Sequence, residues 1–144
     1  MQQENAHGLL AATYFNQNKK WDFDKDNLTD VPLQNRVTIF NKWSFRNRFQ
    51  KLSSVYARYL WENRKGGEMQ MDGGSLNMDS LYQENIYTHR IEVAGNFQLP
   101  VEKFNLQLQT AYSYHAQNSI YGLQSFRNEE HNGRISFVYS YKNV

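Results

Sequence analysis

The feature that most constrains the fold is a period of two in side-chain polarity, clearest in "RVTIFNKWSFR" (36–46). Val37, Ile39, Trp43 and Phe45 occupy odd positions, with Asn41 between them, while most even positions are polar or charged. Successive side chains of a β-strand point to opposite faces, so the pattern predicts a two-faced strand. The same alternation recurs at 52–62, 86–98, 104–116 and 134–142, and a weaker strand is expected at about 7–15.

The connections between these strands alternate in length. Long links are expected at about 16–35, 63–85 and 117–133, and short links at about 47–51 and 99–103. This rhythm is typical of an antiparallel up-and-down meander with its large loops on one edge, as in outer-membrane barrels. The sequence therefore predicts an all-β fold of about six strands.

Composition narrows the classes of protein to consider. No run of about 18 apolar residues exists, which excludes a transmembrane helix. The mean hydropathy of −0.82 is still compatible with a transmembrane β-barrel, because its strands alternate. Cysteine is absent, so a disulfide framework or a cysteine metal site is excluded. The net charge of +2 is too small to indicate a nucleic-acid partner.

Charged residues of the five clearer strands all fall on the polar face. They are Arg36, Lys42, Arg46, Arg58, Glu62, Arg90, Glu92, Arg134 and Lys142. A cation on the lipid face of a membrane barrel costs about 2–4 kcal/mol at the midplane, which would enforce this segregation. A soluble protein core would enforce it as well, so the charges alone leave both interpretations open.

Aromatic residues on the apolar face favour the membrane-barrel interpretation over a soluble core. One group is expected near the short-turn edge: Trp43, Phe45, Phe97, Phe104, Tyr139 and Tyr141. A second group is expected near the long-loop edge: Tyr59, Trp61, Tyr87, Tyr112 and Tyr114. The positions between them are aliphatic or small: Ile39, Val55, Ala57, Ile91, Val93, Leu106 and Leu108. Two aromatic belts around an aliphatic band match the two interfaces of a bilayer. The alternative is a soluble β-barrel or sandwich that binds an apolar small ligand.

Six strands are too few to enclose a filled barrel, for which about eight is the lower limit. An unpaired strand edge is not tolerated in lipid. Residues 1–144 are therefore predicted to be one partial β-barrel domain, a segment of a larger transmembrane barrel. The start "MQQENAHGLL" lacks the basic and apolar regions of a signal peptide, so neither a signal peptide nor a plug domain is expected here.

Several longer stretches resemble TonB-dependent outer-membrane receptors of the Bacteroidetes type, most of all the cobalamin and siderophore receptor branch. They are "ARYLWENRKGGEMQ" (57–70), "SLYQENIYTHRIEVAGNFQLP" (80–100), "TDVP" (29–32), "NKWSF" (41–45) and "YSYHAQNSIYG" (112–122). The resemblance implies a barrel of about 22 strands, plugged by an N-terminal domain and energised through TonB. It implies import of a large nutrient, such as cobalamin or a ferric siderophore, across the bacterial outer membrane.

This resemblance assigns roles to both faces. The lipid bilayer would contact the apolar face, and the three long links would be extracellular. Six charged residues would face the lumen, where they contact the protein's own plug domain or line the transport path: Arg36, Lys42, Arg58, Glu62, Arg90 and Glu92.

The stretch "DFDKDNLTDVP" (22–32) has the spacing of a calcium loop. Positions 1, 3, 5 and 9 of such a loop would be filled by Asp22, Asp24, Asp26 and Asp30. Position 6 is Asn27 instead of Gly, and position 12 is Leu33 instead of a bidentate Glu. The resemblance favours Ca²⁺, because cobalamin receptors have aspartate-rich calcium loops on the extracellular side. A solvated acidic loop is the alternative.

The chain is not expected to be an enzyme. It has no G-x-S-x-G motif, no cysteine nucleophile and no histidine pair at zinc-binding spacing. Aromatic residues and cations fall on opposite faces, which argues against a surface that stacks nucleic-acid bases.

Overall fold

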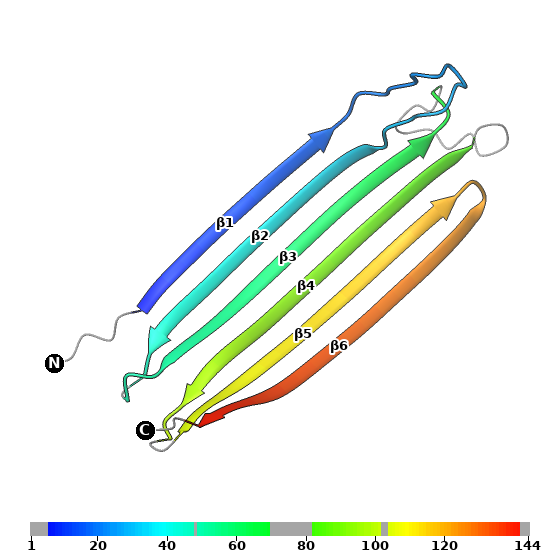
Figure 1. Ribbon diagram of the computed structural model, residues 1–144. Coiled ribbons are helices and arrows are strands. Elements are labelled where there is room, and N and C mark those ends of the chain that lie inside the picture. Colours follow the sequence, from blue (N-terminus) through cyan, green and yellow to red (C-terminus); the bar gives the residue numbers. More distant parts are fainter. Residues whose placement is uncertain (1–5, 48, 70–81, 102–103, 142–144) are drawn as a thin grey trace.

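The computed structural model describes residues 6–47, 49–69, 82–101 and 104–141. They form six strands: β1 (Ala6–Gln17), β2 (Leu33–Arg46), β3 (Leu52–Gly67), β4 (Gln83–Leu99), β5 (Phe104–Tyr121) and β6 (Gln124–Tyr141). Each strand pairs antiparallel with the next, so the order in the sheet is β1-β2-β3-β4-β5-β6 (Figure 1). The predicted six-stranded up-and-down meander is confirmed. Within the described part of the chain, no helix is long and apolar enough to cross a membrane.

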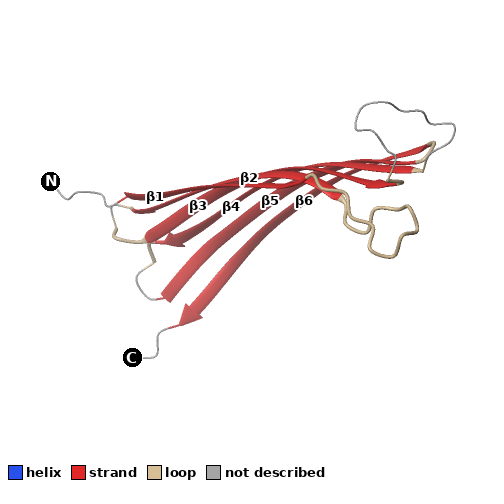
Figure 2. Cartoon of the chain, turned by 90° about the horizontal axis from the view of Figure 1, so that it is seen from above, coloured by secondary structure: helices blue, strands red, loops and turns tan. Residues whose placement is uncertain are grey.

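The sheet is a single open layer. Figure 2, which views the strands from above, shows one twisted sheet with no second layer of strands or helices on either face. Strands β1 and β6 each have one edge without a partner strand among the described residues. None of the large described side chains is fully buried, so the sheet has no core of its own.

The prediction of a third long link at 117–133 is wrong. Strand β5 continues to Tyr121 and β6 begins at Gln124, so only Gly122 and Leu123 connect them. Gly122 has a φ of 56°, a backbone conformation that glycine adopts without steric cost. The residues from 117 to 133, expected to form a loop, instead pair along the two strands, with Gln117 opposite Asn128. Backbone pairing continues there although most side chains on both faces are polar.

The first two long links cover 18–32 and 68–82. The first lies at the upper right of Figure 1, at the end of the sheet where β3 ends and β4 begins. Residues 70–81 of the second lie outside the described residues. The first link is held against the end of β3, because Thr29 donates its N–H to the Gly67 carbonyl at 2.8 Å and Met69 donates to the Asn27 carbonyl at 2.8 Å. The short links, predicted at 47–51 and 99–103, fall at 47–51 and 100–103.

Candidate functional site

The register of the strands gives the sheet two distinct faces. Residues directly opposite one another in neighbouring antiparallel strands point to the same face. Ile39 lies opposite Tyr59, Tyr59 opposite Ile91, and Ile91 opposite Tyr114. We call the face that carries these residues the apolar face and the other the polar face. Strand β1, whose sidedness is unclear from its sequence, places Leu10 on the apolar face, opposite Asn41.

Near the short-turn edge, the register gathers six aromatic residues on the apolar face. Phe104 lies opposite Tyr141 and its ring is 5.0 Å from that of Tyr139. Phe97 and Phe45 both lie opposite Ser53, from the two sides of β3, and the Trp43 ring covers Gly8 of β1. These are the residues expected at this edge: Trp43, Phe45, Phe97, Phe104, Tyr139 and Tyr141.

Towards the loop edge, tyrosine and histidine pairs accompany the second aromatic group. The Tyr59 hydroxyl lies 3.0 Å from Nδ1 of His89, and the Tyr112 hydroxyl lies 2.8 Å from Nδ1 of His131. The Tyr114 and His131 rings are 4.8 Å apart. By the register, this second group comprises Tyr59, Trp61, Tyr87, Tyr112 and Tyr114, together with Tyr14 of β1. The histidine nitrogens therefore give the Tyr59 and Tyr112 hydroxyls a hydrogen-bonding partner on an otherwise apolar face.

The apolar face has no cover. The exposed fraction is 71% for Leu10, 71% for Ile135 and 67% for Phe137, and Ile39, Ile91 and Val93 of the band between the two aromatic groups are also exposed. Soluble monomers rarely expose a continuous apolar surface of more than a few hundred Å². An exposed apolar face of this kind is typical of a surface that contacts another apolar surface or medium.

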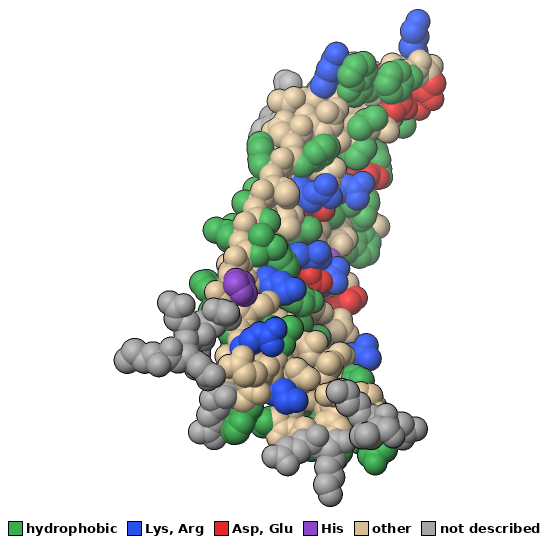
Figure 3. Space-filling model, turned by 60° about the vertical axis from the view of Figure 1, so that its left-hand side comes forward, with side chains coloured by type: hydrophobic (Ala, Val, Ile, Leu, Met, Phe, Trp, Pro, Cys, Tyr) green, Lys and Arg blue, Asp and Glu red, His purple; other side chains and the backbone are tan. Residues whose placement is uncertain are grey.

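The polar face carries a network of ions. Glu92 lies between two arginines, with 2.6 Å from its Oε2 to Nε of Arg58 and 2.8 Å from its Oε1 to an Nη of Arg90. The Arg58 contact is an ion pair without hydrogen-bond geometry at Nε. Glu62 accepts a hydrogen bond from Gln34 and lies 3.8 Å from Nε of Arg64. Figure 3 shows Lys and Arg side chains interspersed with Asp and Glu along the length of the sheet.

The six residues expected in the lumen share this face but differ in their surroundings. Arg58, Arg90 and Glu92 form one cluster, whereas Glu62 belongs to a separate pair with Arg64. Arg36 lies over the Phe15 ring, 5.5 Å from its centroid. Lys42 makes no hydrogen bond or ion pair within the described part of the chain and stands beside a recess.

The recess is a hollow of about 320 Å³ in the polar face. Small residues of β4 and β5, Ala94 and Ala111, lie side by side at its floor, while Tyr56 and Arg134 lie opposite them on the outer strands. The sequence analysis missed this hollow, because it arises from small residues that only the register brings together. Lys142, expected on the same face, lies outside the described residues.

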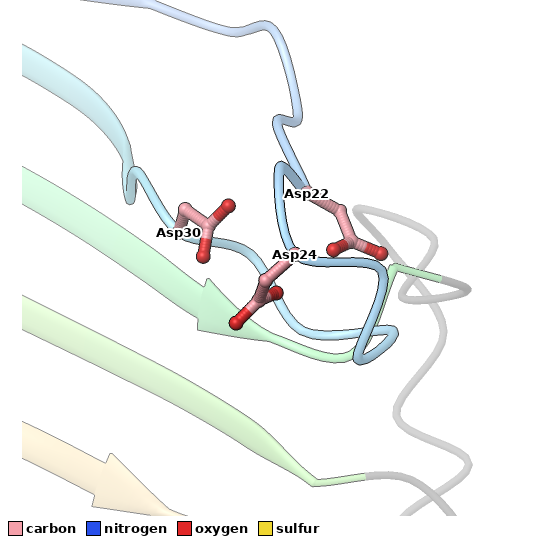
Figure 4. Close-up of side chains that lie close together, drawn as sticks. All are labelled: Asp22, Asp24 and Asp30. Carbon is pink, nitrogen blue, oxygen red and sulfur yellow. The ribbon is translucent and has the colours of Figure 1, made fainter.

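The acidic loop brings together three of its four predicted ligands. Carboxylate oxygens of Asp22, Asp24 and Asp30 lie within 4.8 Å of one another, and the side chains come from two limbs of the same loop (Figure 4). Asp26 is not in this group, because its Oδ1 accepts the backbone N–H of Leu28 at 2.8 Å. The backbone at Asn27 has a φ of 70°, the conformation expected at this position of a calcium loop.

Backbone N–H groups already engage the three carboxylates, and Asp24 accepts the weakest of these hydrogen bonds, from the Asp26 N–H at 3.4 Å. Asp22 accepts hydrogen bonds from the N–H groups of Lys25 and Asn27, at 2.7 and 3.1 Å, and Asp30 accepts one from Phe23 at 2.5 Å. The pKa of Asp24 is raised above its ordinary value, first by loss of surrounding water and then by the like charges of its Asp neighbours. Ca²⁺ takes six to eight oxygen ligands, so the group supplies part of a site. Calcium binding stays a prediction.

Comparison of the chain with models of protein families, with curated proteins and with solved structures finds no match. Three features of the described chain bear on its function: the uncovered apolar face, the charged polar face with its recess, and the acidic loop at the loop edge.

Proposed function

We propose that this chain forms part of the β-barrel of a TonB-dependent receptor in the outer membrane. The observation that carries the proposal is the uncovered apolar face, in which an aliphatic band lies between two groups of aromatic residues. Lipid tails are the apolar medium that such a face fits, and tyrosine and tryptophan concentrate where lipid tails meet water. In β5, the stretch from Phe104 to Tyr114 matches the 9–11 residues that cross a bilayer.

The open edges support a segment of a larger barrel. In lipid every backbone N–H and C=O must be paired within the protein, and only a closed barrel achieves this with strands. The free edges of β1 and β6 therefore need neighbouring strands. The polar face then lines a wet lumen, where Arg58, Arg90 and Glu92 stay hydrated or contact the plug domain.

The kind of cargo follows from the resemblance described above. We propose a large, scarce nutrient such as cobalamin or a ferric siderophore. The links at 18–32 and 68–82 would then be extracellular, where they could contact the cargo before it enters the lumen. The recess beside Lys42 and Arg134 would lie on the lumen side, in the half of the barrel wall nearer the short turns, within reach of a plug.

Refolding tests the membrane part of this proposal. The chain is diluted from urea into buffer alone and into buffer with detergent micelles, and each sample is examined by circular dichroism and analytical ultracentrifugation. We expect defined β-structure in a monodisperse particle with detergent and aggregation without it. A monomer that unfolds cooperatively in plain buffer contradicts the proposal and favours a soluble β-domain that binds an apolar ligand.

The receptor assignment has a separate test. The genomic sequence that flanks this chain is expected to encode further alternating strands and an upstream plug domain. Flanking sequence that encodes unrelated helical or soluble domains would contradict the assignment to a TonB-dependent receptor, even if the chain folds in detergent as expected.

A further inference from the structure

The recess in the polar face has a cation at each of its two ends. One row of directly opposed residues crosses it from β2 to β6: Lys42, Tyr56, Ala94, Ala111 and Arg134. All five line the hollow of about 320 Å³, a volume within the range of sites that bind small molecules. The two alanines give it an apolar floor, and the two charged side chains come from the outer strands of the row.

Both cations keep hydrogen-bond donors that no protein group uses. Lys42 makes no hydrogen bond or ion pair within the described part of the chain. Arg134 donates from its Nε to Oγ of Ser136 at 3.0 Å, and its two Nη groups have no acceptor among the same residues. An ammonium group and the Nη groups of a guanidinium donate strongly to carboxylates. The recess therefore presents free donors of positive charge from two sides.

The residues around the recess do not balance these two charges. No Asp or Glu is among the described residues that line it. Glu92 lies one row further towards the loops, opposite Arg58, and already pairs with Arg58 and Arg90 at 2.6 and 2.8 Å. Two like charges beside one hollow repel each other, and an anion between them is attracted by both. The recess thus has the charge of an anion site.

The order of residues along the row indicates the shape of the anion. At about 4.8 Å between strands, the backbone of Lys42 lies about 10 Å from that of Ala94, and the backbone of Arg134 about 5 Å from that of Ala111. A molecule with a carboxylate at each end can therefore engage both cations, while an apolar middle covers the alanines. The Tyr56 ring offers a flat apolar surface beside this floor.

We propose that the recess binds a short, flat dicarboxylate. One carboxylate pairs with Lys42 and the other with Arg134, and the apolar middle lies over Ala94 and Ala111. The inference goes beyond the proposed function, because it requires only that water reaches the polar face. That condition holds in the lumen of a barrel and on the surface of a soluble sheet alike, so the two proposals can fail separately.

Two isomers of benzenedicarboxylate test the recess. Terephthalate carries its carboxylates at opposite ends of the ring and phthalate carries them side by side, although their composition and charge are the same. The full chain is titrated with each isomer by ligand-observed NMR in the medium in which it folds, detergent micelles or plain buffer. The test variants are Lys42→Met, which removes one charge, and Ala111→Leu, which fills the floor. The matched control is Lys65→Met, which removes the same charge from the apolar face.

We expect about tenfold tighter binding of terephthalate than of phthalate, as one additional charge-assisted hydrogen bond would produce. Lys42→Met and Ala111→Leu should lose this preference, and Lys65→Met should keep it. Equal affinity of the unaltered chain for both isomers overturns the inference, since charge alone would then suffice. A preference that survives both test variants also overturns it, because the ligand would bind elsewhere. Binding of neither isomer overturns it too, and leaves the proposed function to its own refolding test.

Discussion

An arginine placed at three positions of the sheet should cost different amounts in lipid. Ala57 lies on the apolar face opposite Val93, in the middle of the aliphatic band. Asn63 lies about 20 Å further along the same strand, at about 3.3 Å per residue. For a strand tilted by about 45°, this is about 14 Å of depth, close to half of the roughly 30 Å hydrocarbon thickness. Ala57→Arg then places the cation near the midplane, and Asn63→Arg places it at the interface.

The expected costs follow from this depth difference. A lipid-facing arginine costs about 2–4 kcal/mol at the midplane and about 0–1 kcal/mol near the interface. Ala57→Arg should therefore destabilise the inserted sheet by about 2–3 kcal/mol more than Asn63→Arg, or about 30- to 150-fold in the equilibrium constant. Ala94→Arg is the control, because Ala94 lies on the polar face at the recess of about 320 Å³, which has room for the side chain. Its effect should stay within about 0.5 kcal/mol.

Urea titration of the chain in phosphatidylcholine vesicles, followed by tryptophan fluorescence, measures these differences. Two results would refute the reasoning. Equal costs for Ala57→Arg and Ala94→Arg would mean that the two faces have the same surroundings. A cost for Asn63→Arg as large as that for Ala57→Arg would mean that the apolar face is covered by protein along its whole length and not by a bilayer.

Three further predictions concern single residues. Gly67→Ala should lower the free energy of unfolding by about 1–3 kcal/mol, because Gly67 has a φ of 129° and an added Cβ would lie 2.3 Å from a backbone oxygen. Gly133→Ala is the control: Gly133 has open space around it, so this substitution should be neutral or stabilising in the same urea titration. Glu92→Gln should lower stability by about 0.5–1 kcal/mol and less at high salt, and an effect independent of salt would contradict the ion-pair account. Since the raised pKa of Asp24 means that the folded loop holds this proton better than the unfolded loop, protease protection of 18–32 should increase as the pH falls through that pKa. Asp24→Asn should remove this dependence and any added protection by calcium; calcium protection that survives the substitution contradicts a site there.

Local patterns predicted the strands because the period of two is a property of neighbouring residues. The alternation in 36–46 was enough to place Ile39 and Trp43 on one face and Lys42 on the other. The prediction failed for 117–133, where β5 and β6 extend beyond the apolar band. There most side chains on both faces are polar and the few apolar ones do not alternate regularly, while backbone pairing continues to hold the hairpin.

The candidate sites were predictable only in part. The spacing of Asp22, Asp24, Asp26 and Asp30 indicated a cluster, and the structure brings together three of them, Asp22, Asp24 and Asp30. The Asp26 carboxylate lies outside this group because of the backbone conformation of the loop, including the positive φ of Lys25 and Asn27. The spacing of the aspartates does not specify that conformation. The recess is not visible in the sequence, because it assembles residues from strands far apart along the chain, and a shift of one residue in register would separate them.

The most direct test of the account is whether lipid contacts one face of the sheet and not the other. Tyr59 and Tyr56 lie on opposite faces of β3 and are both exposed. In a chain whose three natural tryptophans are replaced by phenylalanine, Tyr59→Trp and Tyr56→Trp each provide one fluorescent reporter for vesicles made with brominated phosphatidylcholine. We predict strong quenching for Tyr59→Trp and little quenching for Tyr56→Trp. Equal quenching at both positions, or stronger quenching for Tyr56→Trp, would contradict the assignment of the apolar face to the bilayer.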